Sequence, residues 1–198
     1  MDGNQALERL LEGNRRYAAM RQLYPRQDQR HRRAVLEGQQ PFAVILSCSD
    51  SRVPSELIFD QGLGDLFIVR VAGHVLDNYV LASLEFAVHV LATPLVMTLG
   101  HSQCGAVNAA IAGSPMPGYI SQLAEGVQPA IEAAQQLPGD LWENAIRVHA
   151  QLTAAQLPAR SPILAQAVQE DRIKIVAAYY DLATGLVTVL EPAPTVER

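Results

Sequence analysis

The sequence contains few of the residues that cross-link a chain or anchor it in a membrane. Its 198 residues include two cysteines and one tryptophan, and no apolar run approaches the roughly 20 residues needed to cross a bilayer. The 15 basic and 20 acidic side chains do not favour binding to nucleic acid or to an anionic membrane. The N-terminus lacks the basic-then-apolar order of a secretory signal. We therefore expect a cytoplasmic protein, free or inside a protein compartment, with no nucleic acid or membrane partner.

The sequence is rich enough in apolar residues, at 49%, to form one sizeable core. Usual domain sizes predict a single domain over residues 1–198, with a helical arm at about 1–38 and an α/β core at about 39–190. Residues 1–40 hold eight arginines against five acids. We interpret this basic charge as solvated helix faces, and the alternative is docking to an acidic neighbouring subunit.

Apolar runs alternate with helical patterns along the core. Three short runs read as strands buried on both faces: residues 42–47, 66–71 and 94–100. Helices are expected between the second and third runs and again, three or four of them, from residue 105 to 169. The segment 173–191 reads as a hairpin with its turn at "ATG". This order predicts an α/β fold with a mostly parallel central sheet flanked by helices and an antiparallel edge hairpin at the C-terminus.

Reactive side chains follow two of the predicted strands. Cys48 comes directly after the first strand, and His101 and Cys104 follow the third. Because open α/β sheets place their sites at the carboxyl ends of parallel strands, these residues can converge. Two thiolates and one imidazole favour zinc, and three protein ligands leave a fourth position free, as in catalytic sites. The alternative is that each cysteine is a small buried apolar residue.

Asp50 and Arg52 continue the alternation that begins at Cys48. In an extended chain, residues two apart project to the same side, so all three side chains can face one metal ion. The carboxylate can then occupy the fourth position or orient a water molecule, and pairing with Arg52 favours the second role. The alternative is that Asp50 caps a helix beginning near Pro54 and forms a surface ion pair.

The motifs "CSDSRVP" (48–54) and "GHSQCGAV" (100–107) together resemble the zinc-site signature of the β-class carbonic anhydrases. The similarity extends to "ALERLLEGNRRYA", "GDLFIVRVAG", "LASLEFAV" and "IVAAYYDLATGLV". It implies that Cys48, His101 and Cys104 hold one zinc ion per subunit and that Asp50 and Arg52 are the catalytic pair. It also implies a homodimer or a dimer of dimers, with the N-terminal helix reaching across to the partner subunit.

The resemblance further implies an enzyme, a carbonic anhydrase, that reversibly hydrates carbon dioxide to bicarbonate and a proton. In the family's pattern Gln39 would donate to a substrate oxygen, and Phe67, Ala72 and Phe86 would line a narrow apolar pocket. Phe86 stands where a tyrosine is common. The alternative for each aromatic residue is ordinary core packing.

Two other functions share these motifs. Family members with nearly the same zinc site hydrolyse carbonyl sulfide or carbon disulfide, and the motifs alone discriminate poorly between these substrates and carbon dioxide. A third possibility is a zinc protein without catalysis that serves as a scaffold, although the intact pair of Asp50 and Arg52 argues against it.

Three positions depart from patterns found in relatives. Ile45 replaces a tryptophan that marks a bicarbonate-regulated subgroup, so we predict that Arg52 holds Asp50 off the metal at neutral pH. Val71 and His74 replace two asparagines in "RVAGH" (70–74). We expect His74 to be a surface or capping residue, and the alternative is a proton relay, which its reference pKa near 6.5 would suit.

Overall fold

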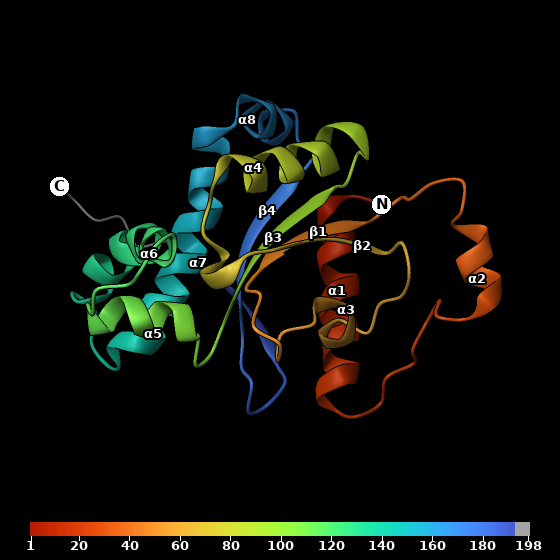
Figure 1. The fold of residues 1–198 in the computed structure, drawn as a ribbon. Helices are drawn as coiled ribbons and strands as arrows, with labels where there is room; N and C mark the ends of the chain where they lie inside the picture. The colour runs from red at the N-terminus through yellow and green to blue at the C-terminus, as the bar shows by residue number, and fades with distance from the viewer. Residues whose placement is uncertain (193–198) are drawn as a thin grey trace.

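A five-stranded sheet forms the centre of the computed structural model, which describes residues 1–192 (Figure 1). Its strands lie in the order β2 (Leu66–Arg70), β1 (Ala43–Ser47), β3 (Leu95–His101), β4 (Lys174–Tyr180) and β5 (Val187–Leu190). The first four are parallel, and β5 pairs antiparallel with β4. The predicted α/β fold, with a mostly parallel sheet and an antiparallel edge hairpin, is confirmed.

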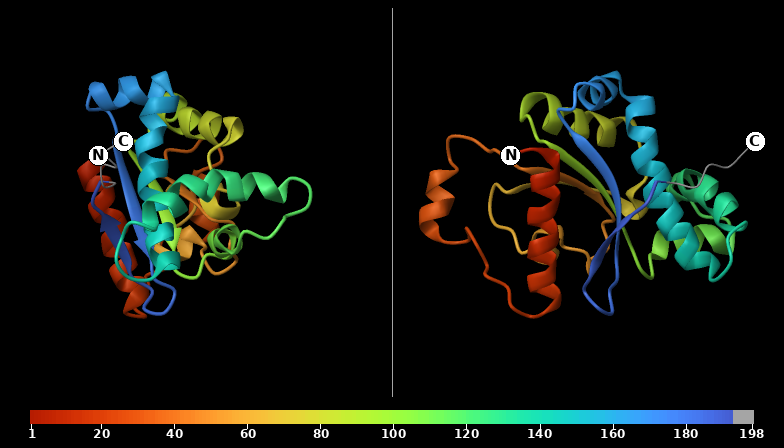
Figure 2. Two further views of the ribbon diagram at one scale, coloured as in Figure 1. Left: turned by 90° about the vertical axis from the view of Figure 1, so that its left-hand side faces the viewer. Right: turned by 180° about the vertical axis from the view of Figure 1, so that it is seen from behind.

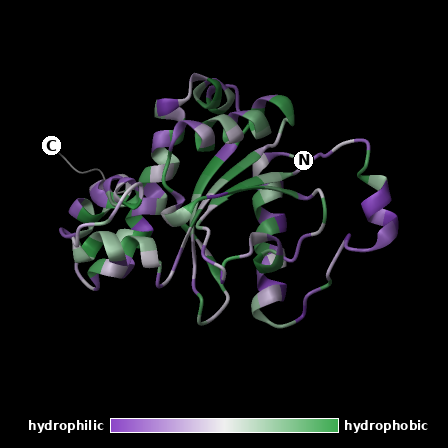
Figure 3. Cartoon of the chain, in the orientation of Figure 1, coloured by the Kyte–Doolittle hydropathy of each residue, from purple (hydrophilic) through white to green (hydrophobic). Residues whose placement is uncertain are grey.

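The central strand β1 shows why the sequence forms such a sheet. Ala43 and Ile45 pack into the core on one face, whereas Val44 and Leu46 pack into the core on the other. Because both faces are covered, all of β1 is buried, and the strand reads as one continuous apolar run. The hydropathy colouring shows the strands mostly in green, whereas most of the helices alternate between green and purple (Figure 3).

Helices cover both faces of the sheet, as the edge-on view shows (Figure 2, left). One face carries α1 (Gly3–Ala18) and the short α3 (Ser55–Ile58); the other carries α4 (Asn78–Glu85), its π-helical continuation η2 (Phe86–Val90), α7 (Leu141–Arg160) and α8 (Pro162–Gln169). Two further helices, α5 (Gly105–Ala112) and α6 (Ile120–Ala134), pack with α7 beside the carboxyl ends of the strands. Among the described residues, none of the helices combines the length and the apolar character that crossing a bilayer requires.

The N-terminal helix α1 docks on its own sheet. Ala6 and Leu10 are fully buried there, and the side chain of Asn14 bonds to the carbonyls of Ile58 and Gly185 and to the amide of Val187. The end of α3 and the turn before β5, two segments far apart in the sequence, are thereby fixed to one helix. The apolar face of α1 is therefore buried within its own chain. The expectation that α1 also reaches across to a partner subunit stays a prediction.

The rest of the arm has a different character. Helix α2 (Gln29–Ala34) buries none of its residues and lies apart from the sheet (Figure 1). Three arginines of the arm pair with acids of the α/β core: Arg9 and Arg26 with Asp65, and Arg16 with Asp60. Part of the basic charge of residues 1–40 therefore forms ion pairs that hold the arm against the core, and the rest faces solvent.

Candidate metal centre

The three predicted ligands meet at the carboxyl edge of the sheet, which is the edge where β1 and β3 end. Cys48 follows β1, His101 ends β3, and Cys104 immediately precedes α5. The β1–β3 ladder pairs Ser47 with Leu99, so the residues that follow, Cys48 and His101, lie at nearly the same level along the sheet. The ligand atoms lie within 4.8 Å of one another, and the three residues are 5%, 0% and 1% exposed.

The state of His101 suits a metal ligand. Its Nδ1 lies 2.9 Å from the carbonyl of Ser102, which can only accept, so Nδ1 carries the ring proton. The other nitrogen, Nε2, is buried without a hydrogen-bond partner among the described residues. A buried lone pair of this kind is costly unless something binds it. With two free thiols beside it, the donor set fits zinc.

The two thiols lie close enough to shift the pKa values of one another. The contact with Cys104, helped by His101 and by the amide of Gly73, lowers the pKa of Cys48. The same contact, together with burial, raises the pKa of Cys104. Backbone amides at the start of α5 act in the opposite direction on Cys104, but the contact with Cys48 outweighs them. A bound cation would hold both cysteines as thiolates.

Asp50 and Arg52 form a bidentate ion pair beside the cluster. The guanidinium donates from Nε to Oδ1 at 2.9 Å and from Nη2 to Oδ2 at 2.7 Å, and the backbone amide of Arg52 also donates to Oδ1. Arg52 thereby lowers the pKa of Asp50 to about 2. The Oδ2 atom lies 4.0 Å from Nε2 of His101. The alternative in which Asp50 caps a helix is wrong, because α3 begins at Ser55 after Pro54 and has no side-chain cap.

Other side chains hold the loops that present these groups. Arg70, the last residue of β2, donates to the carbonyls of Cys48 and Asp50 at 3.0 and 2.6 Å. Trp142 on α7 donates to the carbonyl of Cys104 at 3.1 Å. Neither residue has a role that we predicted from the sequence. Arg70 could have been recognised from the strand order, since it ends the strand beside β1; Trp142 lies far along the chain and gives no such signal.

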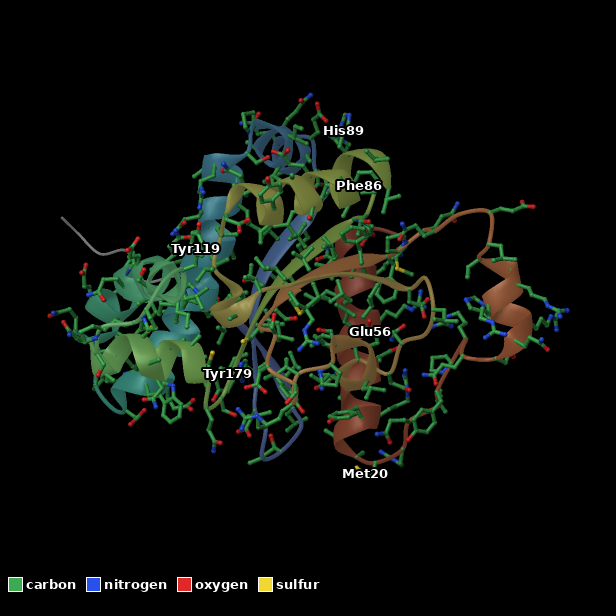
Figure 4. The ribbon with its side chains drawn as sticks, in the orientation of Figure 1. Met20, Glu56, Phe86, His89, Tyr119 and Tyr179 are labelled. Atoms are coloured by element: carbon green, nitrogen blue, oxygen red, sulfur yellow. The ribbon has the colours of Figure 1, made fainter. Side chains whose placement is uncertain are left out.

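The predicted pocket residues divide into two groups. Ala72 begins the turn η1 (Ala72–His74), and the next amide, that of Gly73, donates to Sγ of Cys48 at 3.3 Å. The other three residues lie near the amino ends of the strands: Gln39, Phe67 and Phe86. A strand as long as β3 spans about 20 Å, and Figure 4 shows Phe86 far from Tyr179, which pairs with Gly100 beside His101. The structure therefore does not bring these three residues to the cluster of their own chain.

His74 is neither a surface residue nor a cap. It is 1% exposed, both of its ring nitrogens lack a hydrogen-bond partner among the described residues, and its ring packs 4.4 Å from that of His149. Burial lowers the pKa of His74 well below its ordinary value. A buried ring whose nitrogens have no hydrogen-bond partner among the described residues does not support a proton relay either. His149 was not predicted from the sequence, because its place beside His74 depends on a contact between α7 and η1.

The fold and the buried Cys-His-Cys cluster define an α/β protein with a zinc-type site, and comparison with known proteins agrees. A family model described as "Carbonic anhydrase" matches residues 43–187. Carbonic anhydrase 2 of Mycobacterium tuberculosis is 43% identical over 184 residues, which are 91% of this chain and 89% of the relative. The carbonic anhydrase of Mycolicibacterium smegmatis is 41% identical, with 92% and 90% covered.

Solved structures give the same result. The β-carbonic anhydrase CafA of Aspergillus fumigatus superimposes with a TM-score of 0.76 at 26% identity, covering 84% of this chain and 85% of that one. The β-carbonic anhydrase of Coccomyxa superimposes with a TM-score of 0.72 at 26% identity, covering 91% and 84%. The chain belongs to the β-carbonic anhydrase family. The predicted family and the prediction of an enzyme of this kind are thereby confirmed.

Proposed function

We propose that this protein catalyses the reversible hydration of carbon dioxide to bicarbonate and a proton, with one zinc ion per chain held by Cys48, His101 and Cys104. The observation that carries the proposal is the buried cluster, whose three ligand atoms lie within 4.8 Å of one another beside an ionised carboxylate. A zinc ion supplies a Lewis acid that makes water a nucleophile near neutral pH. The names of the mycobacterial relatives support the same reaction.

Asp50 would accept a hydrogen bond from the attacking water and orient it. The low pKa of Asp50 keeps the carboxylate ionised at neutral pH, so it can only accept. Arg52 engages both carboxylate oxygens, which supports a resting state in which Asp50 stays off the metal. The contacts from Arg70 to the carbonyls of Cys48 and Asp50 keep ligand and carboxylate in fixed relation.

A second copy of the chain would complete the pocket. Gln39 is exposed and lines a hollow of about 490 Å³ beside the arm. Phe86 is 45% exposed, and its ring lies 6.2 Å from that of Phe67. Tyr79 and Val90 extend this apolar surface along α4 and η2. Exposed apolar surface of this kind typically marks an interface, so we propose a homo-oligomer, at least a dimer, in which these residues approach the partner's cluster.

The proposed setting is the cytoplasm. Both cysteines are free thiols and lie where a metal needs them. A reducing compartment keeps such thiols from oxidising to a disulfide.

Stopped-flow hydration assays with metal analysis test the proposed reaction. Wild type should contain about one zinc per chain and hydrate carbon dioxide rapidly. Asp50→Ala should keep its zinc but lose activity by about a hundredfold, since an orienting acceptor contributes at that scale. Ser49→Ala changes the exposed neighbouring residue and serves as the matched control.

The same assays separate the alternatives. Rapid consumption of carbonyl sulfide with negligible hydration of carbon dioxide would assign the protein to the sulfur substrates. Zinc binding without turnover of either gas would leave the scaffold function. Full hydration activity in Asp50→Ala would contradict the role given to the pair of Asp50 and Arg52.

A further inference from the structure

The turn η1 has an uncommon backbone. Gly73 and His74 have φ angles of 65° and 42°, so two successive residues occupy the left-handed region. Glycine adopts this conformation readily, but for histidine it is unfavourable. A side chain at position 73 would also place its Cβ 3.1 Å from Cβ of Ala106, at the start of α5. Such a turn persists only where surrounding contacts hold it.

The turn delivers one amide to the candidate metal site. The N–H of Gly73 donates to Sγ of Cys48 at 3.3 Å. Hydrogen bonds from backbone amides to a ligating sulfur withdraw negative charge from it and so adjust how strongly the sulfur donates to a metal. Any group that holds the Gly73 peptide in place therefore acts on the metal site from a distance.

His149, on α7, is such a group. Its Nε2 lies 2.7 Å from the carbonyl of Gly73, and since that carbonyl only accepts, Nε2 carries the proton. Its ring packs on that of His74. The residue is 4% exposed, and burial lowers the pKa of His149 to about 4, so the ring is neutral at neutral pH. One histidine thus binds the residue whose amide contacts Cys48 and packs on the strained residue that follows.

We propose that His149 is a positioning residue of the zinc site: by donating to the carbonyl of Gly73, it keeps the Gly73 amide on Sγ of Cys48. The inference rests on the proposed zinc site but not on the identity of the substrate. Without this donation, the turn would relax, the sulfur would lose its hydrogen bond, and the three ligands would bind metal less tightly.

Two substitutions of His149 separate donation from packing. In His149→Gln, the amide nitrogen can reach the place of Nε2 and restore the donation, whereas the shorter side chain of His149→Asn ends near the place of Nδ1. The full-length variants are compared by zinc affinity, measured in competition with a chromophoric chelator, and by the absorption spectrum of the cobalt(II)-substituted protein. His89→Asn makes the same chemical change on an exposed residue of η2 and is the matched control (Figure 4).

We expect His149→Asn to bind zinc at least about tenfold more weakly, as is usual when a group that supports a metal ligand is lost. Its sulfur-to-cobalt charge-transfer band should move to longer wavelength, because a sulfur without its hydrogen bond gives up electron density more easily. His149→Gln should restore most of both properties, and His89→Asn should match wild type. Urea unfolding of the metal-free proteins shows whether each variant is folded at the assay temperature.

Two results would overturn the inference. Wild-type affinity and spectrum in both His149 variants would mean that the residue has no positioning role. Equal losses in His149→Gln and His149→Asn would mean that packing alone matters. Neither readout uses carbon dioxide, so a wild-type protein that binds zinc but fails to hydrate the gas would refute the proposed function and leave this inference standing.

Discussion

The two edges of the sheet differ in what a single chain completes. At the carboxyl edge, the ligands, the pair of Asp50 and Arg52 and their supports are buried or bonded to one another. At the amino edge, Gln39 and Phe86 are exposed. Phe67 is only partly buried there, and its ring lies beside that of Phe86. Parallel strands explain the difference, because they gather ligands at one edge and leave residues at their other ends about 20 Å away. A metal site can therefore be built within one chain, while the substrate pocket proposed above would need residues of a second chain.

We expect the largest effect from a substitution that removes a metal ligand at the carboxyl edge. Cys48→Ser removes one thiolate from the cluster, so zinc content should fall from about one per chain to a small fraction, and hydration should fall to nearly the uncatalysed rate. Metal analysis and stopped-flow hydration measure the two losses. Removing zinc from wild type with a chelator should reproduce the loss of activity, and adding zinc back should reverse it only in wild type. A fully active Cys48→Ser protein would contradict the assignment of the ligands.

A second, smaller effect tests whether the amino edge belongs to the site of a partner. Gln39→Ala should keep its zinc and lose activity by about a hundredfold if the side chain donates to a substrate oxygen in the transition state. Gln40→Ala, at the exposed neighbouring position, is the control.

Mixing the two defective proteins makes this comparison sharper. A heterodimer of Cys48→Ser and Gln39→Ala would contain one site with both an intact cluster and an intact Gln39, so refolding an equal mixture should recover about a quarter of wild-type activity. If each chain forms a complete site, the mixture stays as inactive as its parts. Activity measured before and after joint refolding distinguishes the two results.

The smallest effect concerns how the arm is fastened. The carboxylate of Asp60 is buried, but Arg16 and the amides of Leu23 and Tyr24 donate to it and hold its pKa below the ordinary value of 3.8. Asp60→Asn should lower the free energy of unfolding by about 1–3 kcal/mol at pH 6. Because the folded pKa is depressed, this advantage of wild type is present above pH 3.8 and disappears as the pH falls through the folded pKa.

Urea unfolding of both proteins between pH 6 and pH 3 measures this change. The gap between wild type and Asp60→Asn should narrow toward the acid end. Glu12→Gln makes the same change of charge at an exposed position of α1 and should show almost no gap. A gap for Asp60→Asn that stays constant over the whole range would exclude the proposed role of its charge.

Much of the carboxyl edge could be predicted from the sequence because its determinants are local. Cys48, Asp50 and Arg52 follow one buried strand, and His101 and Cys104 follow another, so a parallel sheet suffices to bring them together. The contacts of His74 and His149 could not be predicted in this way. They depend on how α7 packs against a three-residue turn, and nothing in the spacing of the two histidines indicates that contact.

The position of α1 was also beyond the sequence pattern. Its apolar stripe correctly indicated a helix with one buried face, but not which sheet would cover it. Within the chain, the side chain of Asn14 helps to fix this position, since it bonds to two carbonyls and one amide. The role of a polar residue on the buried face of a helix cannot be predicted from the sequence until its hydrogen-bond partners are known.

The separation of the cysteines along the chain has a consequence for folding. Cys48 and Cys104 lie on opposite sides of a long segment that includes α3, β2, α4 and all of β3. An ion held by both thiolates closes that segment into a loop, much as a disulfide would, and lowers the entropy that the chain gains on unfolding. The cofactor of such an enzyme would also be a reversible cross-link, and a protein that loses it would lose stability together with activity.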